Sequence, residues 1–343
     1  MKTLARVYGP FLVLILSLSQ LFSQQVAHNI YFPTELYSLG KESFFIYLDN
    51  DKFIPPSLDE DRDYTNGIAF SYSNKGLLNF PLHKINNWLL QEVLNPQSDS
   101  NFQFLSPEIK LGSLAYTPRD IAESRLILDD RPYASVHYIE IKSRLWNKQK
   151  NQVHSLGISY GVLASPIAEF AQIIIHTIGR IRPVPEGWDN QIAHPWEPTL
   201  LMSYQRDRIW RKEKAHSFLD LKESISLDVG FRLMGAYALT GRWGTKVGKR
   251  DQGQAFLYLR LKPHALAYDA NLEGQFRPSL YTVPRKDIYF FRAEAAAGIS
   301  FNWDWAKRSL KTGYGFYAQS PEARYPTHTR FHYWGRFWLG WVF

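Results

Sequence analysis

Apolar and polar residues alternate with a period of two along several long stretches of this chain. The C-terminal stretch "FHYWGRFWLGWVF", residues 331–343, shows it most clearly. One strand face would carry Phe331, Tyr333, Phe337, Leu339, Trp341 and Phe343, and the other His332, Trp334, Arg336, Trp338 and Val342. The same alternation runs through residues 224–233, 254–262 and 291–303. Several of these runs reach the about 9 to 11 residues that a tilted strand needs to cross a bilayer, against about 5–6 in soluble proteins. The pattern therefore predicts a membrane barrel rather than a soluble sandwich.

The composition agrees with that prediction. Aromatic residues make up 15% of the chain while the mean hydropathy is −0.31, a combination that suits aromatic side chains at a membrane surface around a wet interior. No fixed-period repeat and no low-complexity linker divides the 343 residues. We expect an all-β fold, a single transmembrane antiparallel β-barrel that ends on the aromatic Phe343.

The N-terminus resembles a secretory signal peptide. Lys2 and Arg6 precede the apolar run "FLVLILSLSQLF", which is short for a spanning helix, so we expect cleavage near Ser23. Residues 1–23 would be the signal peptide and residues 24–343 the barrel domain. A retained anchor helix is the alternative. An exported barrel belongs in the bacterial outer membrane.

Cysteine content and charge restrict the chemistry further. The chain has no Cys, which excludes disulfides, thiolate metal sites and thiol nucleophiles. The formal charge of +8 includes Lys2 and Arg6, so cleavage leaves about +6. For an exported protein the natural anionic partner is lipopolysaccharide or membrane phospholipid rather than nucleic acid, although so modest a charge is also compatible with no specific partner.

One segment, residues 165–191, breaks the strand pattern. Ser165 and Pro166 predict a helix start and Gly179 a stop. Glu169, Gln172 and His176 would form one polar stripe on an otherwise apolar helix. Such a stripe is usually a solvated face, but an apolar helix inserted in a barrel must lie against the barrel or in the membrane interface. His176 is therefore a candidate general base.

A second candidate region is "LDNDKFIPPSLDEDRDYTNG", residues 48–67. Asp and Asn residues here are also expected of a plain strand end that turns into a hydrophilic loop. For Asp59, Glu60 and Asp61 we favour that interpretation. Asn50, Asp51 and Thr65, at the two ends of the stretch, would instead lie on adjacent strand ends.

Five ordered blocks resemble the lipid A 3'-O-deacylases of the LpxR type, a family of outer-membrane barrels. They are "YLDNDKF", "DRDYTNG", "YTPRD", "DDRPYAS" and "AQIIIHTIGRIRPVPEGWDNQ", and they lie within residues 44–206. The resemblance implies a barrel of about 12 strands with one short inserted amphipathic helix near the active site. It also implies Ca²⁺-dependent hydrolysis of the acyloxyacyl ester at the 3'-position of lipid A.

Carried over by motif, the family's site residues are Asn50, Asp51, Thr65, Gln172 and His176. Two positions depart from the family pattern. Where the family has a Lys-Arg pair this chain has Glu123-Ser124-Arg125, and where it has an acidic residue after the catalytic His this chain has Arg180 and Arg182. These departures bear on substrate identity more than on the chemistry, because Arg119, Arg125, Arg180 and Arg182 could contact lipid phosphates differently.

Our hypothesis is that His176 deprotonates a water oriented by Gln172 while Asp51 holds a Ca²⁺ ion that polarises the ester carbonyl. Asn50 would help complete the oxygen shell, and Thr65 would position the substrate or the water. Thr65 as a covalent nucleophile is the alternative within this mechanism.

Other interpretations stay open at this stage. Trp188 could reach the site or only pack its loop, and Arg131 is expected to be structural, paired with Asp130 or Asp63. Competing functions are an outer-membrane phospholipase and a non-enzymatic barrel of the same family. We expect a monomer.

Overall fold

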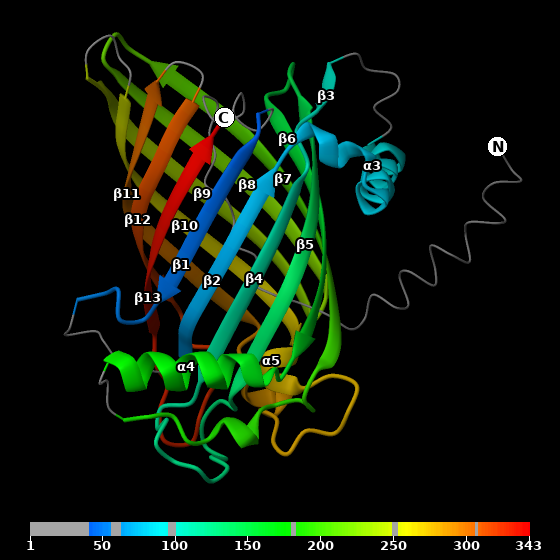
Figure 1. Cartoon of the computed structure of the whole chain (residues 1–343), viewed down its shortest axis with the longest axis vertical. Helices are drawn as coiled ribbons and strands as arrows, with labels where there is room; N and C mark the ends of the chain where they lie inside the picture. Colours follow the sequence, from blue (N-terminus) through cyan, green and yellow to red (C-terminus); the bar gives the residue numbers. More distant parts are fainter. Residues whose placement is uncertain (1–40, 56–62, 95–100, 180–182, 249–252, 306–307) are drawn as a thin grey trace, which may run out of the picture.

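The computed structural model describes residues 41–55, 63–94, 101–179, 183–248, 253–305 and 308–343. The predicted signal peptide and the acidic residues 59–61 lie outside these ranges. The described strands form one antiparallel sheet in the order β3-β5-β4-β2-β1-β13-β12-β11-β10-β9-β8-β7-β6. Because β5 also pairs with β6, the sheet closes on itself. The short β3 pairs only with β5, so twelve strands form the wall of a closed barrel, as predicted (Figure 1).

The strands of the wall are long enough to cross a bilayer. Their bounds are β1 Ser43–Asn50, β2 Asp63–Ser73, β4 Glu108–Thr117, β5 Ala134–Asn147, β6 Gln152–Leu163, β7 Glu197–Glu213, β8 Ser217–Gly230, β9 Arg232–Val247, β10 Gly253–Asp269, β11 Phe291–Trp305, β12 Arg308–Gln319 and β13 His332–Val342. The extra strand β3 is Phe102–Phe104. The helices of the described residues are α3 Pro81–Leu94, α4 Pro166–Gly179 and the single turn α5 Ala270–Glu273, with 3-10 turns at η3 Lys75–Asn79, η5 Trp188–Asn190 and η7 Arg285–Asp287.

The period-two pattern separates a lipid-facing surface from a filled lumen. In β13, His332 and Trp334 are buried inside the barrel, whereas Phe337 is exposed on its outside. The lumen is polar and cross-linked by charge. Arg336 makes two hydrogen bonds to Asp49, of 2.6 and 2.5 Å, and similar buried pairs join Arg144 to Glu108 and Arg242 to Asp220. These paired charges make the interior a packed core rather than an open channel through this part of the barrel.

The alternating stretch 224–233 is not one strand. It runs across a tight turn, because β8 ends at Gly230 and β9 begins at Arg232. Gly230 has a φ of 137°, in a region that disfavours side chains. Phe231, which alternates in phase with the exposed residues Leu227 and Leu233, is buried in the lumenal core instead. A turn cannot be detected from alternation when polar and apolar residues continue to alternate through it, as they do here.

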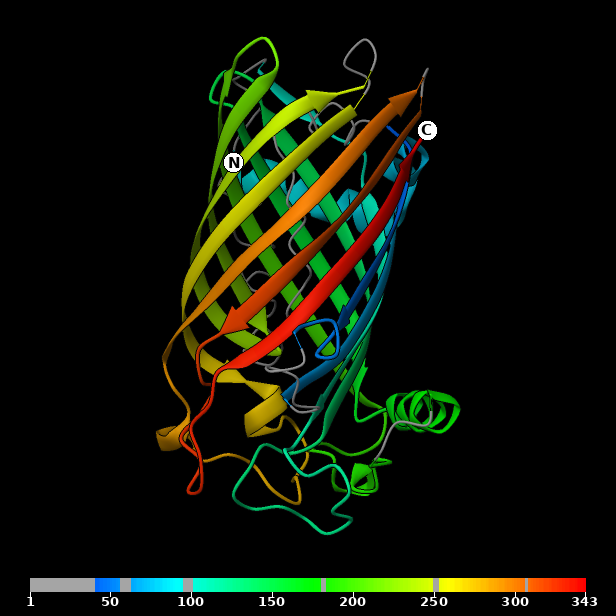
Figure 2. The same cartoon turned by 90° about the vertical axis from the view of Figure 1, so that its left-hand side faces the viewer.

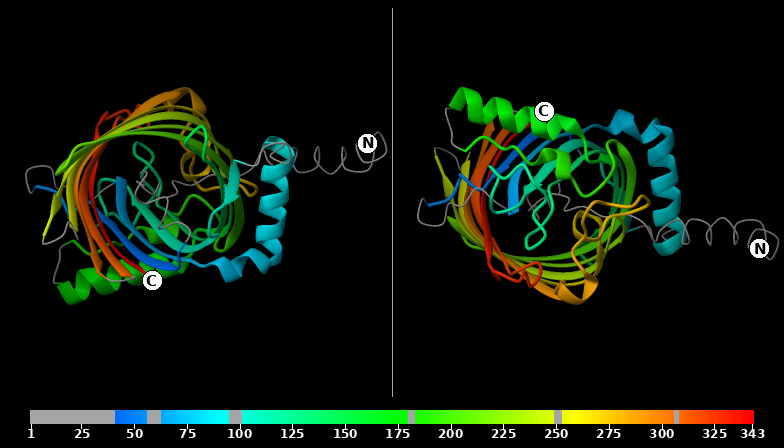
Figure 3. Two further views of the ribbon diagram at one scale, coloured as in Figure 1. Left: turned by 90° about the horizontal axis from the view of Figure 1, so that it is seen from above. Right: turned by 90° about the horizontal axis from the view of Figure 1, so that it is seen from below.

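Helices lie outside the wall at opposite ends of the barrel. In Figures 1 and 2, α4 lies at the lower end, with α5 and the long connections, and α3 at the upper end, where the chain also terminates. The views along the axis in Figure 3 confirm that both helices lie outside the wall and on different sides of it. The single helix expected from the sequence is α4, and α3 is an additional helix of equal length. Within the described ranges, no helix is both long and apolar enough to span a membrane.

Candidate active site

The turn after β1 holds the first two predicted site residues. The Asn50 side chain donates a hydrogen bond of 2.9 Å to the carbonyl oxygen of Thr65, and its own oxygen accepts the backbone N–H of Lys52 at 2.8 Å. The backbone N–H of Asp51 also donates to the Thr65 carbonyl, at 3.4 Å, and the Asp51 side chain is buried. The structure therefore brings Asn50, Asp51 and Thr65 together, and it uses Asn50 to fix the turn.

A bulge in β2 determines where Thr65 points. The register between β2 and β4 shifts between Tyr64 and Asn66, so Thr65 is the extra residue. Tyr64 belongs to the lumenal core, while the Thr65 hydroxyl forms a 2.6 Å hydrogen bond with the hydroxyl of Thr117. In β4, Tyr116 is lumenal and its neighbours in the sequence, including Thr117, face outward. The bulge thus places the Thr65 hydroxyl on the outer surface of the barrel, a common use of bulges beside functional sites.

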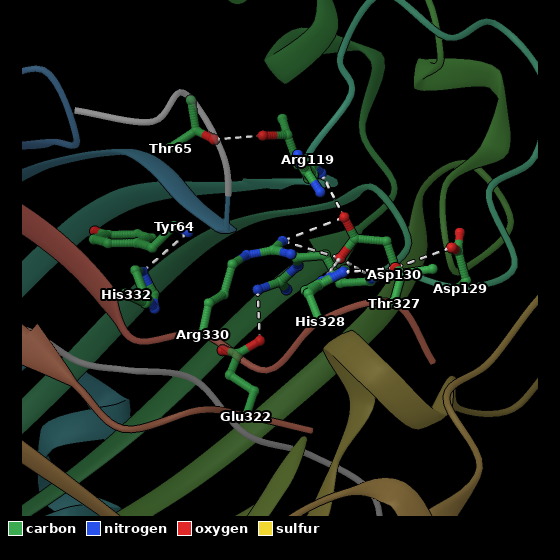
Figure 4. Close-up of polar contacts among 12 residues, drawn as sticks. Tyr64, Thr65, Arg119, Asp129, Asp130, Glu322, Thr327, His328, Arg330 and His332 are labelled. Carbon is green, nitrogen blue, oxygen red and sulfur yellow. Dashed lines mark hydrogen bonds and ion pairs between the residues drawn. The ribbon is translucent and has the colours of Figure 1, made fainter. Parts of the chain in front are cut away.

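The lumenal side of the bulge is fixed by the last strand. Figure 4 shows the ring of His332 beside Tyr64, whose backbone N–H donates to His332 Nε2 at 3.0 Å. The Tyr64 hydroxyl donates to Asp49 Oδ2 at 2.8 Å. Since a backbone N–H can only donate, His332 Nε2 must be the acceptor. Both ends of Tyr64 are therefore tied to the lumen while Thr65 faces the other way.

Helix α4 lies against the outer surface of the wall with an unusual distribution of side chains. Its buried stripe is Ala168, Gln172 and His176, whereas Phe170 is 68% exposed and Ile167 50%. Ala168 packs against Ala115 of β4, in a cluster with Tyr133 and Trp188. The predicted stripe is therefore shifted by one residue at its start, since Glu169 is only partly buried. The helix turns its polar side chains toward the barrel and its apolar side chains away from it.

The position of Ala168 locates the rest of the stripe. The helix runs from the β4 side toward β1 across the outside of the wall (Figures 1 and 3). Successive stripe residues advance about 6 Å along a helix, and neighbouring strands lie about 4.8 Å apart. Gln172 and His176 therefore follow Ala168 on the side of the helix path toward β2 and β1. These are the strands whose ends carry Thr65 and Asp51.

Gln172 is held by the loop that follows its own helix. Trp188 Nε1 donates to Gln172 Oε1 at 2.8 Å, and the Trp188 ring packs on Tyr133 with centroids 4.8 Å apart. Because the indole N–H can only donate, the orientation of the amide is fixed. Its Nε2 group is buried and has no hydrogen-bond partner among the described residues. Gln172 therefore presents an N–H donor that the described residues leave without an acceptor.

The tautomer of His176 is fixed in the same way. Its Nδ1 lies 2.8 Å from the carbonyl oxygen of Pro183, which can only accept, so Nδ1 carries the proton. In the neutral ring Nε2 is then the basic nitrogen, which is the arrangement a general base requires. Both polar residues of the stripe thus have one end anchored by the loop 183–188.

Loops at this end of the barrel are tied together by Asp130. As Figure 4 shows, Asp130 accepts hydrogen bonds from Arg330, at 3.0 and 3.2 Å, and from the backbone N–H of Arg119, at 2.6 Å. Arg131 bonds to Glu322 at 2.7 Å and lies over the Tyr116 ring. Arg131 is thus a structural residue, as expected: Glu322 is a partner of its guanidinium, and Asp130 accepts its backbone N–H at 2.7 Å. These contacts join the connections 118–133 and 320–331.

Two of the four arginines expected to contact lipid phosphates lie within the described residues. Arg125 is exposed and forms an ion pair of 2.9 Å with Glu123, and its side-chain hydrogen bonds lower the pKa of Glu123 to about 2. Arg119 is exposed on the same connection. Arg180 and Arg182 lie outside the described residues. Of the basic candidates, Arg119 and Arg125 can therefore be placed at this end of the barrel.

Sequence reasoning missed three supporting residues, Thr117, Tyr64 and His332, and left Trp188 undecided. Thr117 could have been found in the block "YTPRD", because it follows Tyr116 at the end of an alternating strand. His332 carried no such signal, since its contact joins residues 268 positions apart.

The turn that carries Asn50 and Asp51 contains donors of the kind that bind metal ions. Asp51, Asn50 and Thr65 offer only oxygen and amide groups, which is the chemistry that Ca²⁺ prefers. Asp51 is the one carboxylate that the described residues place in this turn, and the described part of the chain contains no group of three or more His, Asp or Glu side chains arranged to hold a metal. The donor types fit a Ca²⁺ ion at Asp51.

Comparisons with known proteins agree with the barrel fold. The sequence model of the family described as outer membrane protein LpxR matches residues 11–343. LpxR from Salmonella typhimurium has a similar structure, with a TM-score of 0.65 and 14% sequence identity over 88% of this chain and 100% of that chain. The β domain of the Bordetella autotransporter BrkA has a TM-score of 0.44 and 9% identity over 88% of this chain and 98% of that chain, too low to carry an argument. No curated protein sequence matches the chain.

Proposed function

Because the chain belongs to the LpxR family of outer-membrane proteins, with a match over residues 11–343, we propose that it is a lipid A 3'-O-deacylase. The reaction would hydrolyse the ester of the 3'-linked acyloxyacyl chain and so remodel lipopolysaccharide. The protein is an integral β-barrel of the bacterial outer membrane. Its substrate would therefore be a lipid of the membrane that surrounds it.

One observation carries this proposal, the reversed amphipathicity of α4. Its apolar side chains, Phe170 and Ile167 among them, point away from the barrel, and its buried polar residues face the outer wall. In a membrane protein the outward side meets acyl chains. The seam between α4 and the wall then opens to the lipid leaflet, whereas the lumen is filled by paired charges. This arrangement suits an enzyme whose substrate arrives sideways from the membrane.

His176 would act as general base and then as general acid. Its Nε2 takes a proton from a water molecule, whose oxygen attacks the ester carbonyl carbon. When the tetrahedral intermediate collapses, the bond between that carbon and the 3'-oxygen breaks, and the imidazolium returns the proton to the departing sugar oxygen. The products are the released acyloxyacyl acid and a 3'-hydroxyl. Pro183 supports both steps because its carbonyl accepts from Nδ1 and stabilises the imidazolium.

Gln172 would stabilise the charge that develops on the ester oxygen, or orient the water. Its Nε2 is a buried donor with no partner among the described residues, and Trp188 prevents the amide from rotating. A preoriented donor in a site shielded from water is worth more than one that must reorganise during the reaction.

Thr65 would position the substrate or the water through its hydroxyl. Its hydrogen bond of 2.6 Å to Thr117 keeps the hydroxyl on the outer face. The competing role is a covalent nucleophile activated by His176. Replacing Thr65 by Ala and by Ser separates these roles. Hydrolysis that survives Thr65→Ala excludes the covalent role, and activity present only in the Ser variant supports it.

Ca²⁺ remains part of the proposal, with Asp51 as the residue that would hold it and Asn50 close by. When bound, the ion would polarise the ester carbonyl. Asn50 would contribute mainly by holding the turn through its hydrogen bond to the Thr65 carbonyl. We also propose that one chain is sufficient for activity, because the five site residues come from the same chain.

The decisive experiment incubates purified, folded protein with lipid A and, separately, with glycerophospholipid, each with and without a Ca²⁺ chelator. We expect mass spectrometry to show loss of the 3'-linked acyloxyacyl group from lipid A, abolished by the chelator and by His176→Ala. Acyl release from glycerophospholipid alone would identify a phospholipase with the same chemistry. Release from neither lipid would favour a non-enzymatic barrel, and activity that persists in His176→Ala would exclude the mechanism above.

A further inference from the structure

Helix α3 is attached to the outside of the barrel at the end opposite to α4 (Figures 1 and 2). Its buried side is fixed to β5 and β6. The Asn86 amide donates to the carbonyl oxygens of Ile141 and Leu156, at 2.9 and 3.4 Å, and His83 Nδ1 lies 3.2 Å from the Ser143 hydroxyl. Leu90 packs with Leu145 and Leu156. Helix α3 is therefore firmly attached to the outer surface of the wall and is not a loose connection.

Most of the exposed side chains on the outward side of α3 are apolar and uncovered in the described structure, and the charged ones among them are Lys84 and Glu92. Ile85, Trp88 and Val93 are 47%, 42% and 72% exposed, and Phe80 just before the helix is 42% exposed. A helix facing water would place polar residues there. The exposed positions instead continue the apolar surface of the neighbouring strands, where Leu111 is 54% exposed.

The strand register gives the depth of α3 relative to α4. Ala115, which packs against α4, pairs with Ser135 of β5. Ser143, which His83 contacts, lies eight residues further along the same strand. At about 3.3 Å per residue and a tilt of about 40°, the two levels are roughly 20 Å apart along the barrel axis. The apolar band of an outer-membrane barrel is about 25 Å tall.

Both helices therefore lie at the edges of one apolar band. If the level of α4 is one edge, a helix roughly 20 Å away lies within the opposite leaflet or at its surface. The wall between them agrees, because Ile139 of β5 and Tyr160 of β6 are exposed at intermediate levels. Trp88 is then at the depth where tryptophan is enriched in membrane proteins.

Charged groups near α3 are placed for lipid headgroups. Lys75 and Lys84 are exposed at the start of this segment, and Arg208 is exposed on β7 at the same end. Long basic side chains can extend from the apolar boundary to phosphate groups while their stems stay in the apolar region.

We propose that α3 lies in the inner leaflet of the outer membrane, with Ile85, Trp88 and Val93 among the phospholipid acyl chains and Lys84 near the phosphates. The helix thereby sets the depth of the barrel in the membrane and keeps the α4 end level with the outer leaflet. This inference rests on the outer-membrane location and on the strand register. The contact of α3 with lipid does not depend on the enzymatic proposal. The assignment of the inner leaflet to α3 does rest on it, because α4 is placed at the leaflet that holds lipid A.

The experiment uses the absence of cysteine from the chain. Ile85→Cys and Val93→Cys are each labelled with a nitroxide in protein reconstituted into phospholipid vesicles, and collision rates with oxygen and with a water-soluble nickel chelate are measured. Leu259→Cys, on the lipid face of β10, and Lys214→Cys, in an exposed hairpin at the α3 end, are the lipid and water references. The expected result is that both α3 labels resemble Leu259→Cys, with oxygen collisions at least fivefold more frequent than for Lys214→Cys, relative to nickel.

Two outcomes would overturn the inference. Labels that collide with nickel as often as Lys214→Cys would place α3 in the periplasmic water. Labels shielded from both reagents would mean that a second copy of the chain covers the helix. A gel shift between heated and unheated samples confirms that each variant is folded, and because both labelled positions are exposed, either of them alone decides the question.

Discussion

Two buried side-chain amides, on helices at opposite ends of the barrel, are used in different ways. On α3, the Asn86 amide nitrogen donates to two carbonyl oxygens of the wall. On α4, the Gln172 amide oxygen accepts from Trp188, in the loop after the helix, and its nitrogen has no partner among the described residues. Each amide leaves one buried atom without a partner among the described residues, the oxygen of Asn86 and the nitrogen of Gln172, so the spare group on α4 is the one that can donate to a substrate oxygen. Helix α3 therefore uses its amide donor to attach to the wall, whereas α4 keeps its amide donor for the candidate site.

The two helices also each bury one histidine. His83 on α3 contacts a hydroxyl of the wall, whereas His176 on α4 is oriented by the Pro183 carbonyl of its own loop. Paired substitutions at these matched positions therefore test which end of the barrel carries the chemistry.

The largest expected effect is that of His176→Ala. Removing a general base should lower kcat for lipid A deacylation roughly 10²- to 10⁴-fold. His83→Ala, which removes the same ring from α3, should leave the rate within about twofold. Both variants should show the heat-dependent gel shift of a folded barrel. Equal losses in the two variants would mean that His176 acts only through stability.

Gln172→Leu is the next test, with Asn86→Leu as its matched control. Loss of one preoriented donor to the developing oxyanion should lower kcat roughly 10²-fold while KM changes little. Asn86→Leu should keep kcat but weaken the attachment of α3, which limited proteolysis at that helix would reveal. A wild-type kcat in Gln172→Leu would show that the unused amide donor has no catalytic role.

A smaller effect is expected at the bulge that presents Thr65. His332→Ala removes the acceptor for the Tyr64 N–H, and the loss of one hydrogen bond, about 1 kcal/mol, corresponds to a decrease in kcat of roughly fivefold. His332→Gln retains an acceptor and should recover most of the activity. Hydrogen exchange of the Tyr64 amide should quicken in the Ala variant and stay slow in the Gln variant.

A second histidine of the lumen provides the control for this test. His264 is buried in the barrel and contacts the Lys262 carbonyl, away from the bulge. His264→Ala should leave Tyr64 exchange unchanged. If it lowers kcat as much as His332→Ala does, the effect is one of general packing and His332 does not position Thr65.

The sequence predicted the barrel well because each of its strands carries its own evidence. Alternation in residues 254–262 and 291–303 identified segments of β10 and β11 without any knowledge of their neighbours. The helix signal at Ser165, Pro166 and Gly179 was equally local, and α4 occupies the predicted place. Local patterns therefore determined the fold class and the one inserted helix.

The features that could not be predicted from the sequence depend on strand register and on contacts between residues far apart in the chain. Nothing in "DYTNG" indicates a bulge, because the pairing of β2 with β4 determines which residue is the extra one. The contact between Tyr64 and His332 appears only when β13 closes the barrel. Helix α3 was missed although Pro81 is a good first helical residue, because the adjacent Asn86 and Asn87 interrupt its apolar pattern.

The last expected effect concerns pH and the attachment of α3 rather than catalysis. Burial lowers the pKa of His83 from its ordinary 6.5 to about 4, with a further decrease from Arg144 and an opposing increase from Glu108. Between pH 6.5 and 4 a detached helix would carry a protonated His83 while the docked helix would not, so docking weakens as the pH falls and the loss levels off below about 4. At pH 5, amide exchange in α3 should be roughly tenfold faster than at pH 7, after correction for intrinsic rates. His83→Gln cannot be protonated and should remove this dependence, whereas α4, which His83 does not touch, should show the same change in both proteins. If the wild type and His83→Gln respond alike to pH, the attachment of α3 is controlled by another group.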